Sequence, residues 1–174
     1  MDERRPIVTL RPLARDDAAV IARWGADRTL AEVADWSPDR TFAERLRFQE
    51  RLIVTPPPDL LRWGVVQEGS LVGFVNLRGD EPERRELGFL IGASSRWGHG
   101  LGRAAAAAGL DLAFGELGLD QVLAEAYDAH QRSVRILQGL GMRETGRGAA
   151  GQFLGVPTFY RRFAISAEEW RART

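Results

Sequence analysis

The sequence predicts one α+β domain over residues 1–174, built on a mixed, mostly antiparallel twisted sheet of about six to seven strands flanked by about four helices. Three observations support this fold class. The length suits one compact domain with its own core. A content of 44% hydrophobic and 28% charged residues is typical of a globular chain. Short β-rich segments around a glycine turn in the middle of the chain indicate antiparallel strands.

The N-terminal third predicts a strand followed by two helices. Residues 7–11 alternate apolar and polar side chains, which is typical of a strand. Residues 15–27 carry apolar side chains at helical spacing. A second helix is marked by a capping box formed by Thr41 and Glu44, and the prolines at 56–58 end it.

The middle of the chain predicts an antiparallel meander. Residues 61–67 and 71–78 flank the short turn 68–70 and form a hairpin. Residues 85–91 then supply a third strand of this meander. A long helix is expected from about residue 103 to 117.

The C-terminal part alternates strands and helices. A strand over residues 121–127 precedes a helix over 131–140, which Gly141 ends in a left-handed conformation. A short strand begins at Met142 and another spans about 158–165. The glycine-rich residues 146–157 are interpreted as a surface loop between them, and Ser166 and Glu169 are expected to cap a last helical turn.

Composition excludes several kinds of chemistry. The 24 basic and 24 acidic residues cancel, so no overall charge favours nucleic acid or an anionic membrane. Every basic residue is arginine and cysteine is absent, which removes a thiolate nucleophile, a Schiff-base lysine and the lysine of a Walker loop. With only His99 and His130, no metal centre is expected. Without a signal peptide or long apolar run, a cytoplasmic protein is expected.

One segment concentrates the functional signals. The predicted strand ending at Ile91 leads into a turn containing Gly98, Gly100 and Gly102, and a helix follows at once. Such a turn exposes consecutive backbone N–H groups beside the positive end of a helix, which suits a pyrophosphate. An ordinary glycine-containing connection is the alternative. A dinucleotide-binding fold is disfavoured because the preceding hairpin is antiparallel.

The order of motifs resembles a known family. The segment Trp97-Gly-His-Gly-Leu-Gly102, the strand from Glu86 to Ile91, and the run from Ser133 to Met142 are similar to the core of the GNAT superfamily of acetyl-CoA-dependent N-acetyltransferases. The N-terminal L-R-P-L and the terminal E-E-W resemble the RimJ/RimL-type branch. The resemblance covers nearly the whole chain, and it implies a cleft where the fourth and fifth strands splay apart.

The resemblance also implies the cofactor-binding residues. Acetyl-CoA would be the cosubstrate, with an amine acceptor that is a protein N-terminus or a small molecule, and no metal. Its pantetheine arm would pair with the backbone of the cleft strand, and its pyrophosphate would bind the amides of the glycine turn. The implied strand residues are Phe89, Leu90 and Ile91, and the implied turn residues are Trp97, Gly98, His99, Gly100, Leu101, Gly102 and Arg103.

Three residues are the implied catalytic candidates. Glu86 is the preferred base that removes the amine proton, and a solvated glutamate is the alternative. Ser133 is the preferred contact to the departing thiolate, with an N-terminal capping serine as the alternative. His130 stands where the family usually has asparagine, and Leu137 stands where many members have a tyrosine acid. An acyl-CoA-binding sensor without transfer activity and a purely structural domain therefore remain alternatives, and a homodimer is compatible with the sequence.

Overall fold

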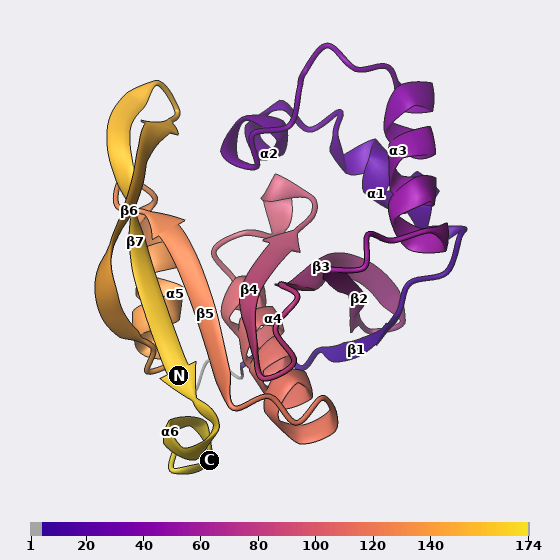
Figure 1. The fold of residues 1–174 in the computed structure, drawn as a ribbon. Helices are drawn as coiled ribbons and strands as arrows, with labels where there is room; N and C mark the ends of the chain where they lie inside the picture. Colours follow the sequence, from indigo (N-terminus) through magenta and orange to yellow (C-terminus); the bar gives the residue numbers. More distant parts are fainter. Residues whose placement is uncertain (1–4, 174) are drawn as a thin grey trace.

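The computed structural model describes residues 5–173 and forms one seven-stranded sheet in the order β1-β2-β3-β4-β5-β7-β6 (Figure 1). All neighbouring strands are antiparallel except β4 and β5, which are parallel. Helices cover both faces. The predicted mixed, mostly antiparallel α+β architecture is confirmed.

The first four strands form the predicted meander. They are β1 (Thr9–Pro12), β2 (Leu60–Gln67), β3 (Ser70–Arg78) and β4 (Arg84–Ile91). The β2–β3 turn uses Glu68 and Gly69, both with positive φ, which gives the tight connection that the glycine predicted.

Three N-terminal helices lie together and pack on one face of the sheet (Figure 1). The helix predicted over residues 15–27 is confirmed as α1 (Asp17–Trp24), which is shorter at both ends, and a second helix that was not predicted, α2 (Arg28–Val33), follows it. The break between the two helices occurs because Asp27 adopts an extended backbone and its side chain caps α2 through the Leu30 amide. Helix α3 (Phe42–Val54) carries the predicted capping box of Thr41 and Glu44.

The other face is covered by α4 (Leu101–Asp111) and α5 (Gln131–Gly139), which pack against the sheet in the larger of the two apolar cores. Helix α4 begins two residues earlier than predicted and continues as a π-helical segment, Leu112–Glu116. Gly141 after α5 has φ +84°, as expected for a left-handed helix end. A last short helix, α6 (Ala167–Arg171), carries the predicted cap of Ser166 and Glu169.

The C-terminal sheet half differs from the prediction. Strand β5 (Gln121–Tyr127) pairs with β7 (Val156–Ser166), and β7 pairs with the edge strand β6 (Arg143–Phe153). The surface loop predicted over residues 146–157 is instead most of a long, twisted hairpin (Figure 1). Its glycines mark two register shifts and a close approach to the aromatic side chains of β5 and β7, not an irregular loop.

None of the helices in residues 5–173 is long and apolar enough to cross a bilayer.

Candidate active site

The sheet opens between β4 and β5. The two strands are paired only at Arg84, Arg85 and Glu86, opposite residues 121–123. Beyond Glu86 the strands separate, which confirms the predicted splay between the fourth and fifth strands. The rest of β4 therefore presents an unpaired edge toward this opening.

The register of β3 and β4 decides which backbone groups that edge offers. The Gly92 amide donates to the Val72 carbonyl oxygen at 2.9 Å, so in this register every second residue of β4 is bonded to β3. Leu90 belongs to the bonded set, while Phe89 and Ile91 point their backbone groups into the opening. The expectation that Leu90 pairs with a pantetheine arm is therefore corrected: its backbone faces β3.

The glycine turn presents a continuous row of amides. No hydrogen bond within the described chain engages the backbone N–H groups of residues 98–103, which lead into the first turn of α4. Gly98 and Gly100 have φ of +85° and +82°, which turns successive amides toward the same side at positions that favour glycine. The Trp97 amide is excluded from this row, in correction of the expectation, because it donates to the Ser94 carbonyl oxygen at 3.0 Å.

Side chains from other elements hold this turn in place. The indole Nε1 of Trp97 donates to the Ile91 carbonyl oxygen at 2.8 Å, which ties the turn to the end of β4. Asp27 receives the Leu30 amide on one oxygen and the Ser94 amide on the other, at 3.1 and 2.7 Å. Although burial disfavours its charged form, these hydrogen bonds lower the pKa of Asp27. Sequence reasoning missed Asp27 because its partner lies 67 residues away.

A cavity of about 790 Å³ runs along the turn and the open edge of β4. Four arginines and no carboxylate line it: Arg96, Arg103, Arg132 and Arg135. This electrostatic environment favours an anionic ligand. Of the predicted residues, the cavity wall includes Phe89, Leu90, Ile91, Trp97, Gly98, Gly100, Leu101, Gly102, Arg103, His130 and Ser133, and it leaves out His99 and Glu86.

The start of α5 forms the wall opposite the turn. His130 is the cap residue of this helix and its ring stacks on Phe153 at 4.5 Å between centroids. Burial, and secondarily the charge of Arg132, lower the pKa of His130, which keeps it neutral near pH 7. Ser133 follows within the first turn and is not the cap, so the capping alternative is wrong. No described residue shares a hydrogen bond with its hydroxyl.

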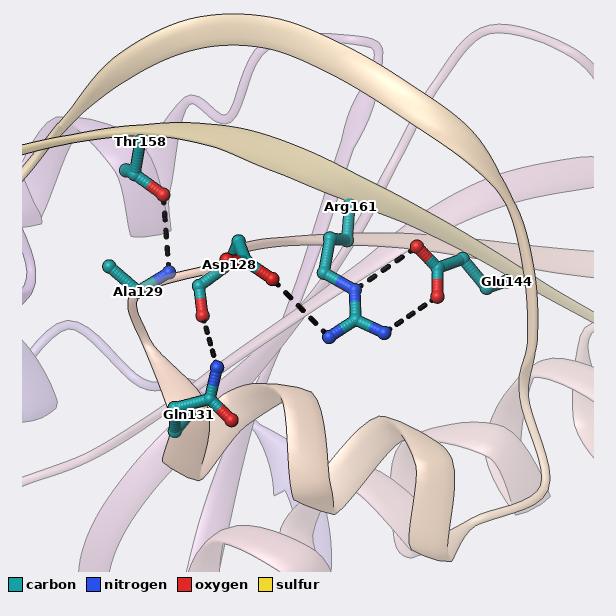
Figure 2. Close-up of polar contacts among 6 residues, drawn as sticks. All are labelled: Asp128, Ala129, Gln131, Glu144, Thr158 and Arg161. Atoms are coloured by element: carbon teal, nitrogen blue, oxygen red, sulfur yellow. Dashed lines mark hydrogen bonds and ion pairs between the residues drawn. The ribbon is translucent and has the colours of Figure 1, made fainter.

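A polar network fixes this wall to the C-terminal hairpin (Figure 2). Arg161 of β7 donates to both carboxylate oxygens of Glu144, at 3.1 and 2.6 Å, and pairs with Asp128 at 3.4 Å. The Thr158 hydroxyl accepts the Ala129 amide at 3.1 Å. Asp128 therefore acts as an ion-pair partner that positions the turn before α5, a role that requires β7 and is invisible in the local sequence.

Glu86 lies beside the opening on the face of the sheet that α1 to α3 cover, opposite to the face covered by α4 and α5. Leu87 points toward α4, so by strand alternation Glu86, Gly88 and Leu90 face the side of α1 to α3. The carboxylate stays accessible to solvent. Partial burial raises the pKa of Glu86, and the negative charge of Glu125 raises it further. The positive charges of Arg78 and Arg162 lower it by less.

Residues 8–143 match the family model described as an acetyltransferase (GNAT) domain. The chain belongs to the GNAT acetyltransferase family. Membership confirms the predicted class of enzyme, an N-acetyltransferase with acetyl-CoA as cosubstrate, and agrees with the free amides and basic cavity described above. No curated protein matches the chain.

Solved structures of GNAT enzymes share the fold. A spermidine N-acetyltransferase from Vibrio cholerae, in complex with CoA and spermine, has a TM-score of 0.79 at 21% identity, covering 94% of this chain and 98% of that one. A GNAT family acetyltransferase from Bacillus anthracis has a TM-score of 0.78 at 18% identity, covering 95% and 98%. A dodecameric structure of spermidine N-acetyltransferase from Vibrio cholerae has a TM-score of 0.75 at 22% identity, covering 96% of this chain and 98% of that one.

Within residues 5–173 no group of three or more histidine, aspartate or glutamate side chains is placed to hold a metal ion.

Proposed function

We propose that this GNAT enzyme moves the acetyl group of acetyl-CoA directly to a primary amine, through the splayed opening between β4 and β5. The observation that carries the proposal is the row of amides at residues 98–103, which has no internal partner and lies on a cavity lined by four arginines. A diphosphate bound there would direct the rest of the cosubstrate along the open edge of β4, where the backbone of Phe89 and the amide of Ile91 face the opening.

The residues around the opening supply the remaining steps. The amine nitrogen attacks the thioester carbon, a C–N bond forms and the C–S bond breaks. Glu86 takes the amine proton, through water where the distance requires it, because its raised pKa brings it closer to the basicity that such a step needs. The hydroxyl of Ser133 donates a hydrogen bond to the departing thiolate, since no described residue engages it. His130 and Trp97 shape the cavity wall.

The test is an assay of free-thiol release from acetyl-CoA over a panel of acceptors. The panel contains peptides with free N-termini, because the motifs resemble the RimJ/RimL-type branch, and polyamines, because spermidine N-acetyltransferases share the fold. We expect thiol release that depends on the acceptor. Binding of acetyl-CoA without acceptor-dependent release over the whole panel would overturn the transfer proposal.

A second candidate function is supported by Leu137. The side chain at the position where many family members carry a tyrosine acid is apolar and 1% exposed in the core. An acyl-CoA sensor that binds but does not transfer would need no acid there. Calorimetry with acetyl-CoA followed by the thiol assay separates the two functions: heat of binding with no thiol release supports the sensor.

A further inference from the structure

A row of three residues crosses the sheet where β4 and β5 begin to separate, and none of the three lines the cavity described above. Arg62 of β2 pairs with Asn76 of β3, and Asn76 pairs with Gly88 of β4. A Cβ built on Gly88 would meet only two atoms of Asn76, at 3.8 and 3.9 Å. The surface above Gly88 is therefore open except for the Asn76 side chain, on the same face as Glu86.

Arg62 fixes the orientation of the Asn76 carboxamide. Its Nε donates to Asn76 Oδ1 at 2.8 Å, and because a guanidinium can only donate, the oxygen must face it. The amide nitrogen, Nδ2, is then the atom that lies 3.9 Å from the Gly88 Cβ position. No described residue accepts a hydrogen bond from it. The Asn76 Nδ2 donor, which Arg62 holds in this orientation, thus lies beside the open space where β4 and β5 separate.

The positive charge behind Asn76 is not neutralised by the protein. Arg62 donates a second hydrogen bond to the carboxamide oxygen of Gln49, at 3.1 Å, and lies 4.1 Å from the centre of the Phe74 ring. No carboxylate within residues 5–173 forms an ion pair with it. Burial, and secondarily the charge of Arg78, lower the pKa of Arg62 to about 10. A desolvated cation without a counter-ion favours an anion nearby.

We propose that Asn76 and Arg62 bind the carboxylate of the acceptor, so that the substrate is an amino acid whose amine lies close to its carboxylate. The proposal rests on the proposed acetyl transfer. Asn76 lies across from Gly88 on β3, and Glu86 lies two residues from Gly88 on the same face of β4, about 7 Å along the strand. An acceptor above Gly88 would therefore direct its amine toward Glu86 and its carboxylate toward Asn76. A polyamine carries no oxygen for the Asn76 donor.

The test measures how fast the wild-type protein acetylates each of three matched acceptors: an α-amino acid, its amide and the decarboxylated amine. Amino acids with small, aliphatic and aromatic side chains are each used in this set, and spermidine is added. We expect kcat/KM for the amino acid to exceed that of the amide and of the decarboxylated amine by about 10- to 100-fold, the range for a hydrogen bond to a charged group. Equal or faster transfer to the decarboxylated amines or spermidine would overturn the proposal while leaving the acetyltransferase intact.

The variant Asn76→Asp probes the same site with little change of shape. The new carboxylate would pair with Arg62, remove the Nδ2 donor and repel the acceptor carboxylate. We expect the preference for the amino acid to disappear, with an unchanged dissociation constant for acetyl-CoA. Gln67→Glu, which adds the same charge at the far end of β2, should retain the wild-type preference.

Calorimetry of the three acceptors with the CoA-saturated protein gives the ranking without turnover. Tighter binding of the amino acid, lost in Asn76→Asp, would support the carboxylate site even if no acceptor were acetylated, in which case only the transfer proposal fails. Equal binding of all three, or binding unchanged in Asn76→Asp, would exclude the site.

Discussion

The glycine turn and the sheet surface around Gly88, called here the acceptor face, are built in opposite ways. The turn offers the main-chain amides of six successive residues, 98–103, and its shape follows from the local backbone. The acceptor face combines side chains from β2, β3 and β4, represented by Arg62, Asn76 and Glu86. In the function proposed above, the first binds the diphosphate of the cosubstrate and the second distinguishes acceptors. Changes in the turn should therefore alter cosubstrate affinity, and changes on the face should alter the rate or the choice of acceptor.

Glu86→Gln gives the sharpest test of this separation. Loss of a general base should lower kcat about 10²- to 10⁴-fold. The dissociation constant for acetyl-CoA should stay unchanged, because Glu86 does not line the cavity. Steady-state kinetics and calorimetry measure the two quantities, and an equal loss in both would give Glu86 a structural role.

The pH profile adds a signature of ionisation. Only the ionised carboxylate accepts a proton, so the rate should rise with pH through the folded-state pKa of Glu86, which lies above the ordinary glutamate value. This acid limb should vanish in Glu86→Gln and persist in Glu83→Gln, a matched change in the exposed loop before β4. A limb that survives in Glu86→Gln belongs to another group.

Gly100→Asp should affect the turn and spare the acceptor face. It places a side chain at φ +82°, 3.2 Å from the Pro6 ring at its Cβ, and adds a negative charge beside the expected diphosphate. We expect about 100-fold weaker acetyl-CoA binding, because the carboxylate repels the diphosphate and because a side chain at this φ, with a strain of about 1–2 kcal/mol, moves the turn away from the shape that holds its amides together. Gly100→Ala carries the strain without the charge and should lose less. Unchanged affinity in Gly100→Asp would remove the diphosphate from this turn.

The same contrast explains what the sequence could predict. The glycines at 98 and 100, the capping boxes at Thr41 and Ser166 and the β2–β3 turn are local signals, and the structure confirms each of these elements. The opening between β4 and β5 followed from the family resemblance. The position of Asn76 opposite Gly88 depends on strand register, which no short motif specifies.

The errors have a common physical origin in long-range contacts. The helix predicted over residues 15–27 ends early because Asp27 binds the Ser94 amide as well as capping α2. The loop predicted over residues 146–157 is a hairpin because β7 supplies a partner for a glycine-rich strand that looks irregular by itself. Tertiary pairing overrides local propensity in both places.

Gly151→Ala tests whether the glycines of β6 serve packing. A Cβ at Gly151 would lie 2.6 Å from the Tyr127 hydroxyl, and Tyr127 stacks on Tyr160 at 4.0 Å between ring centroids. We expect a loss of about 1–3 kcal/mol in the free energy of unfolding, typical of overpacking. Ala149→Ser, at an exposed position of the same strand, is the control. Full stability of Gly151→Ala in denaturant titration would assign the glycine to local flexibility instead.

Asp27→Asn should give the smallest effect and should connect the turn to the N-terminal helices. The variant keeps the size of the side chain but weakens its bonds to Leu30 and Ser94, so we expect a loss of about 1 kcal/mol in stability at neutral pH. The folded-state pKa of Asp27 is lowered, so its ionised form contributes stability above its unfolded pKa, near 3.9, and this contribution is lost as the pH falls through the folded value. The stability difference between wild type and Asp27→Asn should therefore narrow in acid, in thermal unfolding scans over a pH series. Asp16→Asn, next to α1, is the matched control for the loss of an acidic side chain in the same region. A gap that does not narrow as the pH falls toward full protonation of Asp27 would mean that Asp27 holds the turn by shape and not by charge.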